Sequence, residues 1–186
     1  MSPQAVTNSE QRQPDPDLTG HQQFMRIALA EGRAALDAGE FPVGCVLVGD
    51  DRVLVRGRRI NSSGADCNEL DHAEVTALRR LLTMNPQTDC SRVTAYSTME
   101  PCLMCYATML LSGIRRFVWA FEDIMGGGTN VPLEQLHDLY AGMQVELVPN
   151  VLRAEGLALF QNFFRRHEYW RDSPLARYTL AQPTGE

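Results

Sequence analysis

The order in which apolar patterns alternate along the chain is the strongest constraint on its fold. Two β-branched runs, 43–48 and 52–57, flank Gly49-Asp50-Asp51 and predict a hairpin. After this hairpin, segments with a helical period alternate with short apolar runs. Strand–helix–strand units of this kind pack with right-handed crossovers on a mostly parallel sheet. We therefore expect an α/β fold, a three-layer α/β/α sandwich around a five-stranded mixed sheet whose only antiparallel pair is the hairpin.

The same periods predict the individual elements. Helices are expected over residues 21–38, 72–84, 102–112, 133–140 and 152–166, and strands over 43–48, 52–57, 93–97, 116–121 and 144–148. Residues 1–19 are rich in Pro, Gln, Asp and Ser and have no apolar period, which predicts a disordered leader. We expect one domain over 20–166, followed by a C-terminal extension over 167–186.

Composition excludes several classes of function. Apolar residues make up 44% and charged residues 22% of the 186 residues, as in ordinary globular domains. The net charge is −6, and all 17 basic residues are arginine. A chain without lysine cannot form a Schiff base or supply a Walker-type phosphate lysine. The acidic balance argues against a protein that coats a polyanion, because nonspecific affinity for nucleic acid comes from phosphate neutralisation.

Neither a targeting segment nor a membrane span is predicted. The first residues carry no apolar h-region, and the longest uncharged stretch, 101–114, is too short and too polar to span a bilayer. We expect a cytoplasmic protein without a membrane partner. In such a compartment, the spacing of the five cysteines matters more than their number.

Two short segments carry the chemistry, His72-x-Glu74 and Cys102-x-x-Cys105, and each opens a predicted helix. At a helix start, two sulfurs with this spacing can point at one metal ion, and the unpaired backbone N–H groups favour thiolate. An imidazole from a neighbouring helix start makes three protein ligands, and three ligands with one open position are typical of catalytic zinc. We predict one Zn²⁺ per chain, held by His72, Cys102 and Cys105.

Glu74 has a separate role in this pattern. It lies two positions from His72, which places a carboxylate near the metal without making it a ligand. Zinc held by two thiolates is a weaker Lewis acid than zinc held by three histidines, so its water benefits from an added base. We expect Glu74 to be that base and therefore the catalytic residue.

Two other interpretations of the cysteines stay open. A thioredoxin-like redox pair would use Cys-x-x-Cys after a first strand, and it explains neither His72 nor Glu74. A structural zinc site would need a fourth ligand, for which Cys67 and Cys90 are candidates, although neither repeats the Cys-x-x-Cys spacing. The catalytic interpretation therefore depends on the combination of both segments.

The combination resembles the cytidine and deoxycytidylate deaminase superfamily, whose motif is His-x-Glu followed by Pro-Cys-x-x-Cys. Similarity to the tRNA-adenosine and guanine deaminase branches extends over residues 22–166. It is carried by Glu40–Val48, by Thr98–Cys105, and by Asn61, eleven residues before His72, where those branches have a base-reading Asn. The resemblance implies a cytidine deaminase-like fold and a zinc-dependent deaminase domain.

The resemblance also implies a mechanism that agrees with the chemistry of the residues. Zinc on His72, Cys102 and Cys105 would bind water, and Glu74 would remove its proton. Hydroxide would attack the ring carbon that bears the amino group, while Glu74 returns protons to the ring nitrogen and the departing amine. The exocyclic amine becomes a carbonyl, and ammonia leaves.

Five residues are predicted to contact substrate: Asn61, Phe41, Pro42, Ala73 and Asp123. Asn61 can donate to and accept from a heterocycle edge, or it is a loop residue that tolerates an unusual backbone angle. Phe41 and Pro42 form an apolar wall for stacking, or they belong to the core. In relatives, the backbone N–H at the position of Ala73 contacts the ring. Related enzymes place substrate-sorting loop residues near Asp123, although a solvated loop carboxylate explains it equally.

Three functions remain open. We predict a deaminase of a free nucleobase or nucleoside, such as guanine, cytosine or adenosine, since an acidic surface suits a substrate without a phosphate chain. A wobble-adenosine deaminase of tRNA is the alternative, supported by 41–48, 98–105 and the Phe-Phe-Arg-Arg segment at 163–166. A noncatalytic zinc-containing partner subunit is the third, and the presence of Glu74 disfavours it.

Two further features concern coverage of the site and assembly. Aromatic residues in 169–178 could cover an active site, as a C-terminal segment does in guanine deaminases, but we favour packing on the surface of the domain. Superfamily members usually assemble through the helices that flank the site, so a homodimer is expected. Met109, Leu110 and Leu111 fit either a dimer interface or the core.

Overall fold

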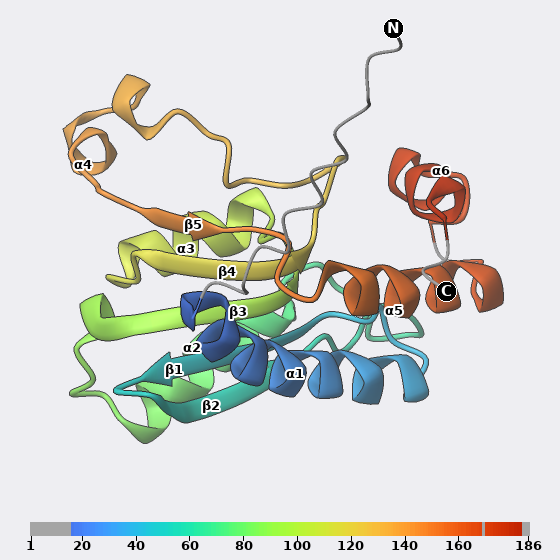
Figure 1. Ribbon diagram of the computed structural model, residues 1–186, viewed down its shortest axis with the longest axis horizontal. Helices are drawn as coiled ribbons and strands as arrows, with labels where there is room; N and C mark the ends of the chain where they lie inside the picture. Colours follow the sequence, from blue (N-terminus) through green and yellow to red (C-terminus); the bar gives the residue numbers. More distant parts are fainter. Residues whose placement is uncertain (1–15, 169, 184–186) are drawn as a thin grey trace, which may run out of the picture.

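A five-stranded sheet forms the middle layer of the protein (Figure 1). The computed structural model describes residues 16–168 and 170–183, so most of the predicted leader and Tyr169 lie outside the described residues. The strands are β1 (Gly44–Gly49), β2 (Arg52–Arg58), β3 (Val93–Met99), β4 (Arg116–Phe121) and β5 (Glu146–Val148). They lie in the order β2-β1-β3-β4-β5.

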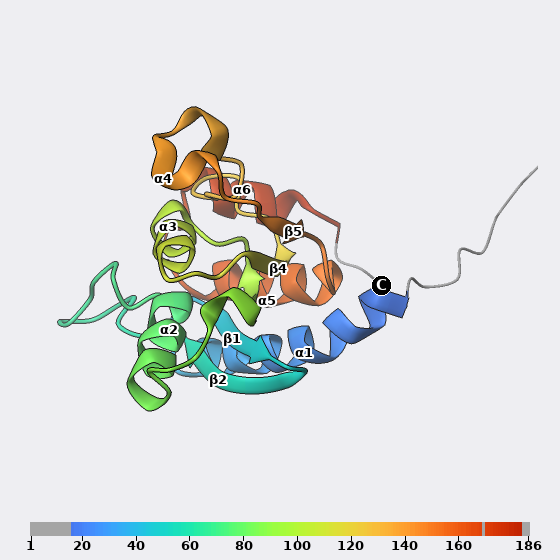
Figure 2. The same cartoon turned by 90° about the vertical axis from the view of Figure 1, so that its left-hand side faces the viewer.

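Helices cover both faces of this sheet (Figure 2). The helices are α1 (Pro16–Asp37), α2 (Ala73–Met84), α3 (Leu103–Leu111), α4 (Asp138–Ala141), α5 (Arg153–Arg166) and α6 (Pro174–Ala181). α1 and α5 lie on one face, and α2 and α3 lie on the other. The predicted α/β/α sandwich with a five-stranded mixed sheet is confirmed. Each helix within the described residues is too short or too polar to cross a bilayer.

The predicted strand pairing is wrong in one respect. β1 pairs antiparallel with β2 and also with β3, whereas β3–β4 and β4–β5 are parallel. The hairpin therefore gives one of two antiparallel pairs, because the chain returns through α2 and adds β3 on the free side of β1. Periodicity predicts that a strand exists, but it does not say which edge of the hairpin that strand joins.

Two helix boundaries also differ from the prediction. α1 begins at Pro16 rather than at residue 21, since an apolar period marks only the buried part of a helix and proline suits a first helical turn. The helix expected over 133–140 is a 3-10 turn, Leu133–Gln135, followed by the short α4. Neither piece has a buried residue, so no apolar face holds the segment in one continuous helix.

The central strands are buried almost completely. Every residue of β3 is buried, and only Arg116 of β4 is exposed. Strands that are covered on both faces are expected to be largely apolar, as β4 is, whereas β3 also buries the hydroxyl side chains of Thr94, Ser97 and Thr98. On the α1 face, Phe24 and Met25 pack with Tyr96 of β3. This core holds the carboxyl end of β3 in place, and the chain enters α3 from there.

The described part of the predicted C-terminal extension packs on the rest of the protein. Leu175 and Ala176 of α6 are fully buried. The Gln161 side chain on α5 donates hydrogen bonds to the carbonyls of Thr179 (3.1 Å) and Gln182 (2.9 Å). These contacts hold α6 against α5, beside the loop that follows β4.

α2 approaches β2 most closely at Gly57. A Cβ atom at this position would lie 2.4 Å from the carbonyl oxygen of Ala73 and 2.8 Å from the backbone nitrogen of Ala77. Both distances are below van der Waals contact, so only glycine fits there. The contact sets the position of the first turn of α2, which contains Ala73 and Glu74.

We expect Gly57→Ala to lower the free energy of unfolding by about 1–3 kcal/mol, because the added methyl group must push α2 off the sheet. Denaturant unfolding followed by circular dichroism measures this loss. Gly20→Ala on α1 is the matched control, because nothing lies within 4 Å of a Cβ atom there and alanine favours a helix. Equal stability of Gly57→Ala and wild type would contradict the close contact.

Candidate metal centre and active site

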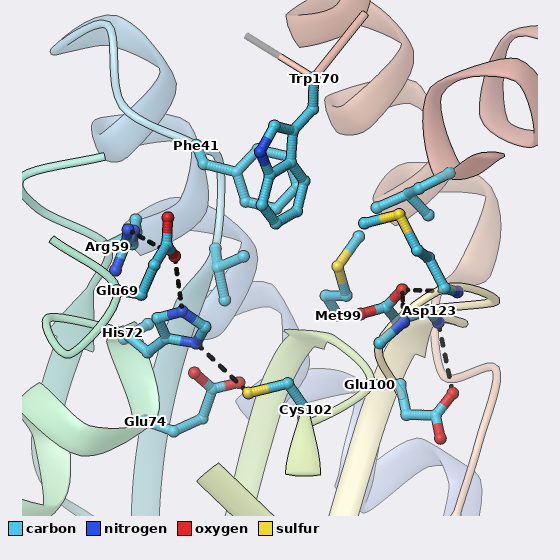
Figure 3. Close-up of a pocket in the computed structure, with 15 residues that line it drawn as sticks. Phe41, Arg59, Glu69, His72, Glu74, Met99, Glu100, Cys102, Asp123 and Trp170 are labelled. Carbon is cyan, nitrogen blue, oxygen red and sulfur yellow. Dashed lines mark hydrogen bonds and ion pairs between the residues drawn. The ribbon is translucent and has the colours of Figure 1, made fainter. Parts of the chain in front are cut away.

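Two helix starts meet beside the carboxyl end of β3 (Figure 3). His72 is the N-cap residue of α2, and Cys102 is the N-cap residue of α3. Cys105 lies in the first turn of α3 and is fully buried. The first backbone N–H groups of a helix have no partner within it, so both helix ends favour negative charge at this point.

The three predicted ligands come together. The Nδ1 atom of His72 lies 3.5 Å from Sγ of Cys102 and 3.4 Å from Sγ of Cys105. Zn–S and Zn–N bonds of ordinary length in a tetrahedron place nitrogen and sulfur about 3.6 Å apart. The donor set and its spacing therefore fit one zinc ion. Neither Cys67 nor Cys90 belongs to this cluster, so no fourth protein donor closes it among the described residues.

Proton affinities in the cluster reflect the same proximity. A hydrogen bond from Cys105 and another with His72 lower the pKa of Cys102 to about 4, although burial acts in the opposite direction. The hydrogen bond to Cys102 and burial raise the pKa of Cys105. Burial opposes protonation of His72, but its hydrogen bond to Cys102 and the charge of Glu74 outweigh burial and raise the pKa. A cysteine with a lowered pKa loses its proton readily, and metal binding requires deprotonated cysteine.

Glu74 is the buried carboxylate beside the cluster. Only 3% of the surface of Glu74 is exposed. The hydroxyl of Ser97 donates a hydrogen bond to Oε1 of Glu74 (2.8 Å), and the Cys105 thiol lies 3.5 Å from Oε2. Burial raises the pKa of Glu74, and the charge of His72 offsets this only in part. A carboxyl group with a raised pKa can both accept and return a proton near neutral pH.

A cavity opens above these groups. Its floor contains His72, Glu74 and Cys102, and Phe41 and Trp170 lie across from them (Figure 3). Phe41 is buried and packs edge-on against Phe163, with ring centroids 5.1 Å apart, so it belongs to the core and to the cavity wall.

Two of the other predicted substrate contacts also line the cavity. Ala73 does so as the first residue of α2, where its backbone N–H has no partner within the helix. Asp123 lines the opposite side, and its Oδ1 accepts hydrogen bonds from the backbone N–H groups of Met125 (3.0 Å) and Gly126 (2.9 Å). Asp123 is half-buried, and burial raises the pKa of its carboxyl group.

Asn61 and Pro42 are not among the residues that line this cavity. The side-chain nitrogen of Asn61 donates a hydrogen bond to the carboxylate of Asp71 (2.7 Å). The backbone of Asn61 is left-handed, with φ of 54°, a conformation that Asn tolerates better than most residues. Substrate binding by Asn61 and Pro42 stays a prediction.

The loop after β4 lies directly on the metal-binding turn. A Cβ atom on Gly128 would lie 2.5 Å from Cα of Leu103, and the N–H of Gly128 donates to the Pro101 carbonyl (2.9 Å). The three-glycine run in the loop over 122–132 therefore lets backbone pack on backbone. This contact fixes the part of the loop that presents Asp123 to the cavity.

Several residues that line or support the site are absent from the predicted set. Ser97 bonds to Glu74 but lies in β3 among other buried hydroxyl side chains, so no sequence signal distinguishes it. Arg59 and Glu69 line the cavity from the loop before α2. A loop has no apolar period, so the sequence does not indicate which of its polar residues face a cavity. Trp170 was noted only as an aromatic residue of the extension, with surface packing favoured, and it lies in the cavity wall.

A buried carboxylate beside three zinc donors, on an α/β/α sandwich, defines a zinc-dependent deaminase. The chain belongs to the cytidine and deoxycytidylate deaminase family, since the model of its zinc-binding region matches residues 18–121. This match includes all three donors and Glu74.

Known proteins of this family resemble the chain over most of its length. A tRNA-specific adenosine deaminase of Agrobacterium fabrum is 30% identical over 146 residues, which are 76% of this chain and 92% of that protein. The solved structure of a tRNA:A34 deaminase, an A-to-I editing enzyme of the tRNA wobble position, is 29% identical with a TM-score of 0.59 and covers 68% of this chain and 96% of its own. Guanine deaminase from Nitrosomonas europaea shares the fold, with a TM-score of 0.62 at 18% identity over 86% of this chain and 98% of its own.

We expect Cys102→Ser to retain less than about a tenth of the zinc of the wild type after dialysis, because a serine hydroxyl stays protonated and binds zinc poorly. Elemental analysis of the purified proteins measures zinc per chain. Cys67→Ser is the matched control, since Cys67 is exposed and outside the cluster. Full zinc content in Cys102→Ser would remove Cys102 from the ligand set.

Proposed function

We propose that the protein hydrolyses the exocyclic amine of a free nucleobase or nucleoside to a carbonyl and releases ammonia. The observation that carries this proposal is the position of Phe41 and Trp170 across the cavity from Glu74 and the zinc donors (Figure 3). Their ring centroids lie 6.0 Å apart at 52°. A flat heterocycle can lie against such aromatic faces while its amine-bearing carbon points to the floor.

The residues of the floor divide the chemistry. His72, Cys102 and Cys105 would hold the zinc ion, which when bound supplies a Lewis acid that lowers the pKa of a water molecule. Glu74 would take up the two protons of the attacking water in turn and deliver one to the ring nitrogen and the other to the departing amine. The carbon–nitrogen bond breaks, one water is consumed, and one ammonia is released. The hydrogen bond from Ser97 keeps Oε1 of Glu74 in place during these transfers.

Charge around the cavity supports a free substrate. Its lining residues include Glu69, Glu74 and Asp123, whereas Arg59 is its single arginine among the described residues and pairs with Glu69. The whole chain is also acidic, with a net charge of −6. Phosphates of a polynucleotide would meet like charge at this wall, which lowers their affinity.

Deamination of the wobble adenosine of tRNA is the second candidate. It is supported by the relatives described above, because the Agrobacterium fabrum protein and the tRNA:A34 deaminase act on tRNA and are 30% and 29% identical to this chain. A noncatalytic partner subunit is disfavoured by Glu74, which is present and buried beside the zinc donors.

We further propose a homodimer that acts in the cytoplasm. Leu111 of α3 is 57% exposed, and Leu103 on the same helix is 56% exposed, which suits a contact between two copies. Met109 and Leu110 are buried within the chain and belong to the core. A reducing compartment keeps the thiols of Cys102 and Cys105 available for metal.

We expect Glu74→Gln to retain zinc and to lose turnover by about 10²–10⁴-fold, because an amide cannot take a proton from water. Ammonia release at saturating substrate, together with zinc content, measures both properties. A variant with a tenth of the wild-type rate would contradict the role of Glu74 as the proton carrier.

We expect free bases or nucleosides, and not an anticodon stem-loop, to be deaminated in a panel that compares both kinds of substrate with and without a zinc chelator. Trp170→Ala should raise KM for the best free substrate about tenfold, since one aromatic contact is lost. Leu180→Ala, an exposed residue of α6, is the matched control. Turnover of the stem-loop alone, sensitive to salt, would contradict the free-substrate proposal and support the tRNA candidate.

A further inference from the structure

The two ring nitrogens of His72 face different partners. Nδ1 lies toward the sulfurs of Cys102 and Cys105, and Nε2 lies 3.5 Å from Oε2 of Glu69. A nitrogen that binds a metal carries no proton, so the proton of the neutral imidazole must be on Nε2. Nε2–H therefore lies on the side of the ring that faces the Glu69 carboxylate, across an ion-pair contact of 3.5 Å (Figure 3).

Glu69 is held by a buried arginine. Nη2 of Arg59 donates to the Asn68 carbonyl at 2.6 Å and to Oε2 of Glu69 at 3.2 Å. Arg59 has only 3% of its surface exposed, and its backbone N–H donates to the Val43 carbonyl at 2.8 Å. The backbone of Arg59 is thus anchored beside the end of β2, and its guanidinium bonds to the loop that carries Glu69.

This arrangement differs from an ordinary surface ion pair. The Glu69 side chain is 65% exposed, and a pair between two such exposed groups contributes little. Here Arg59, the partner of Glu69, is buried, and its Nη1 atom has no hydrogen-bond partner among the described residues. Glu69 is the carboxylate that forms an ion pair with this buried guanidinium, and removing it would leave the charge less well compensated.

We propose that Arg59 and Glu69 are positioning residues that orient the zinc ligand His72 and slow the loss of zinc. The proposal rests on the zinc-dependent function argued above, but neither residue lies in the His-x-Glu or Pro-Cys-x-x-Cys motif. Carboxylates that accept from the second nitrogen of a metal-binding histidine fix its tautomer and ring orientation and raise its basicity. Glu69 fills this role in the loop before α2, and Arg59 holds Glu69 in reach.

The test measures zinc release from the holoprotein to a colorimetric chelator, without substrate. We expect Glu69→Ala to release zinc about 10–100-fold faster than the wild type, the usual effect of removing such a partner. Glu69→Gln keeps an oxygen that can accept from Nε2–H but loses the charge, so its rate should lie between the two. Asp66→Ala, which removes another exposed carboxylate from the same loop, should match the wild type.

Arg59→Lys tests the second member of the pair. It keeps the charge but loses the planar fork, and we expect zinc release faster than in the wild type and slower than in Glu69→Ala. Circular dichroism identifies any variant that fails to fold. Because Glu69 is exposed, Glu69→Ala keeps the test decisive if Arg59→Lys does not fold.

Wild-type zinc release from Glu69→Ala would overturn the proposal. If turnover falls in the same variant while zinc release is unchanged, Glu69 is a substrate contact and not a positioning residue. The zinc-release assay uses no substrate. A failure to deaminate every base tested would therefore contradict the proposed function, but it would not affect the test of Arg59 and Glu69.

Discussion

The convergence of two helix N-termini on one point is the constraint on which the rest of the structure depends. His72 and Cys102 occupy the N-cap positions of α2 and α3, although thirty residues separate them. Strands β1 and β3 lie side by side and bring these helices together, and Gly57 lets α2 lie close to the sheet. Without this packing, the three donors would be ordinary side chains on separate elements.

The chemical floor of the site could be predicted from the sequence, because metal binding and acid–base chemistry demand particular residue types at particular spacings. His72, Cys102 and Cys105 meet within 3.5 Å contacts, with Glu74 buried beside them. The sandwich followed from periodicity, since apolar periods report which faces are covered. The position of β3 beside β1 did not follow, because pairing between distant strands leaves no local pattern.

The walls of the cavity were harder to predict for a related reason. Arg59 and Glu69 come from an irregular loop, and Trp170 comes from the segment between α5 and α6. Their positions depend on long-range contacts such as the hydrogen bond from Arg59 to the Asn68 carbonyl. The contact between Asn61 and the base rests on the resemblance to the family and stays a prediction, and the side chain of Asn61 bonds to Asp71 in this structure.

The anchoring of α6 has a consequence for handling and redesign of the protein. Tyr178 donates a hydrogen bond to Glu122 (2.6 Å), which also pairs with Arg153 at the start of α5, and Gln161 binds the far end of α6. These bonds hold the helix that follows Trp170, a residue of the cavity wall, against the rest of the protein. Removing α6 would therefore release the segment that carries this part of the wall.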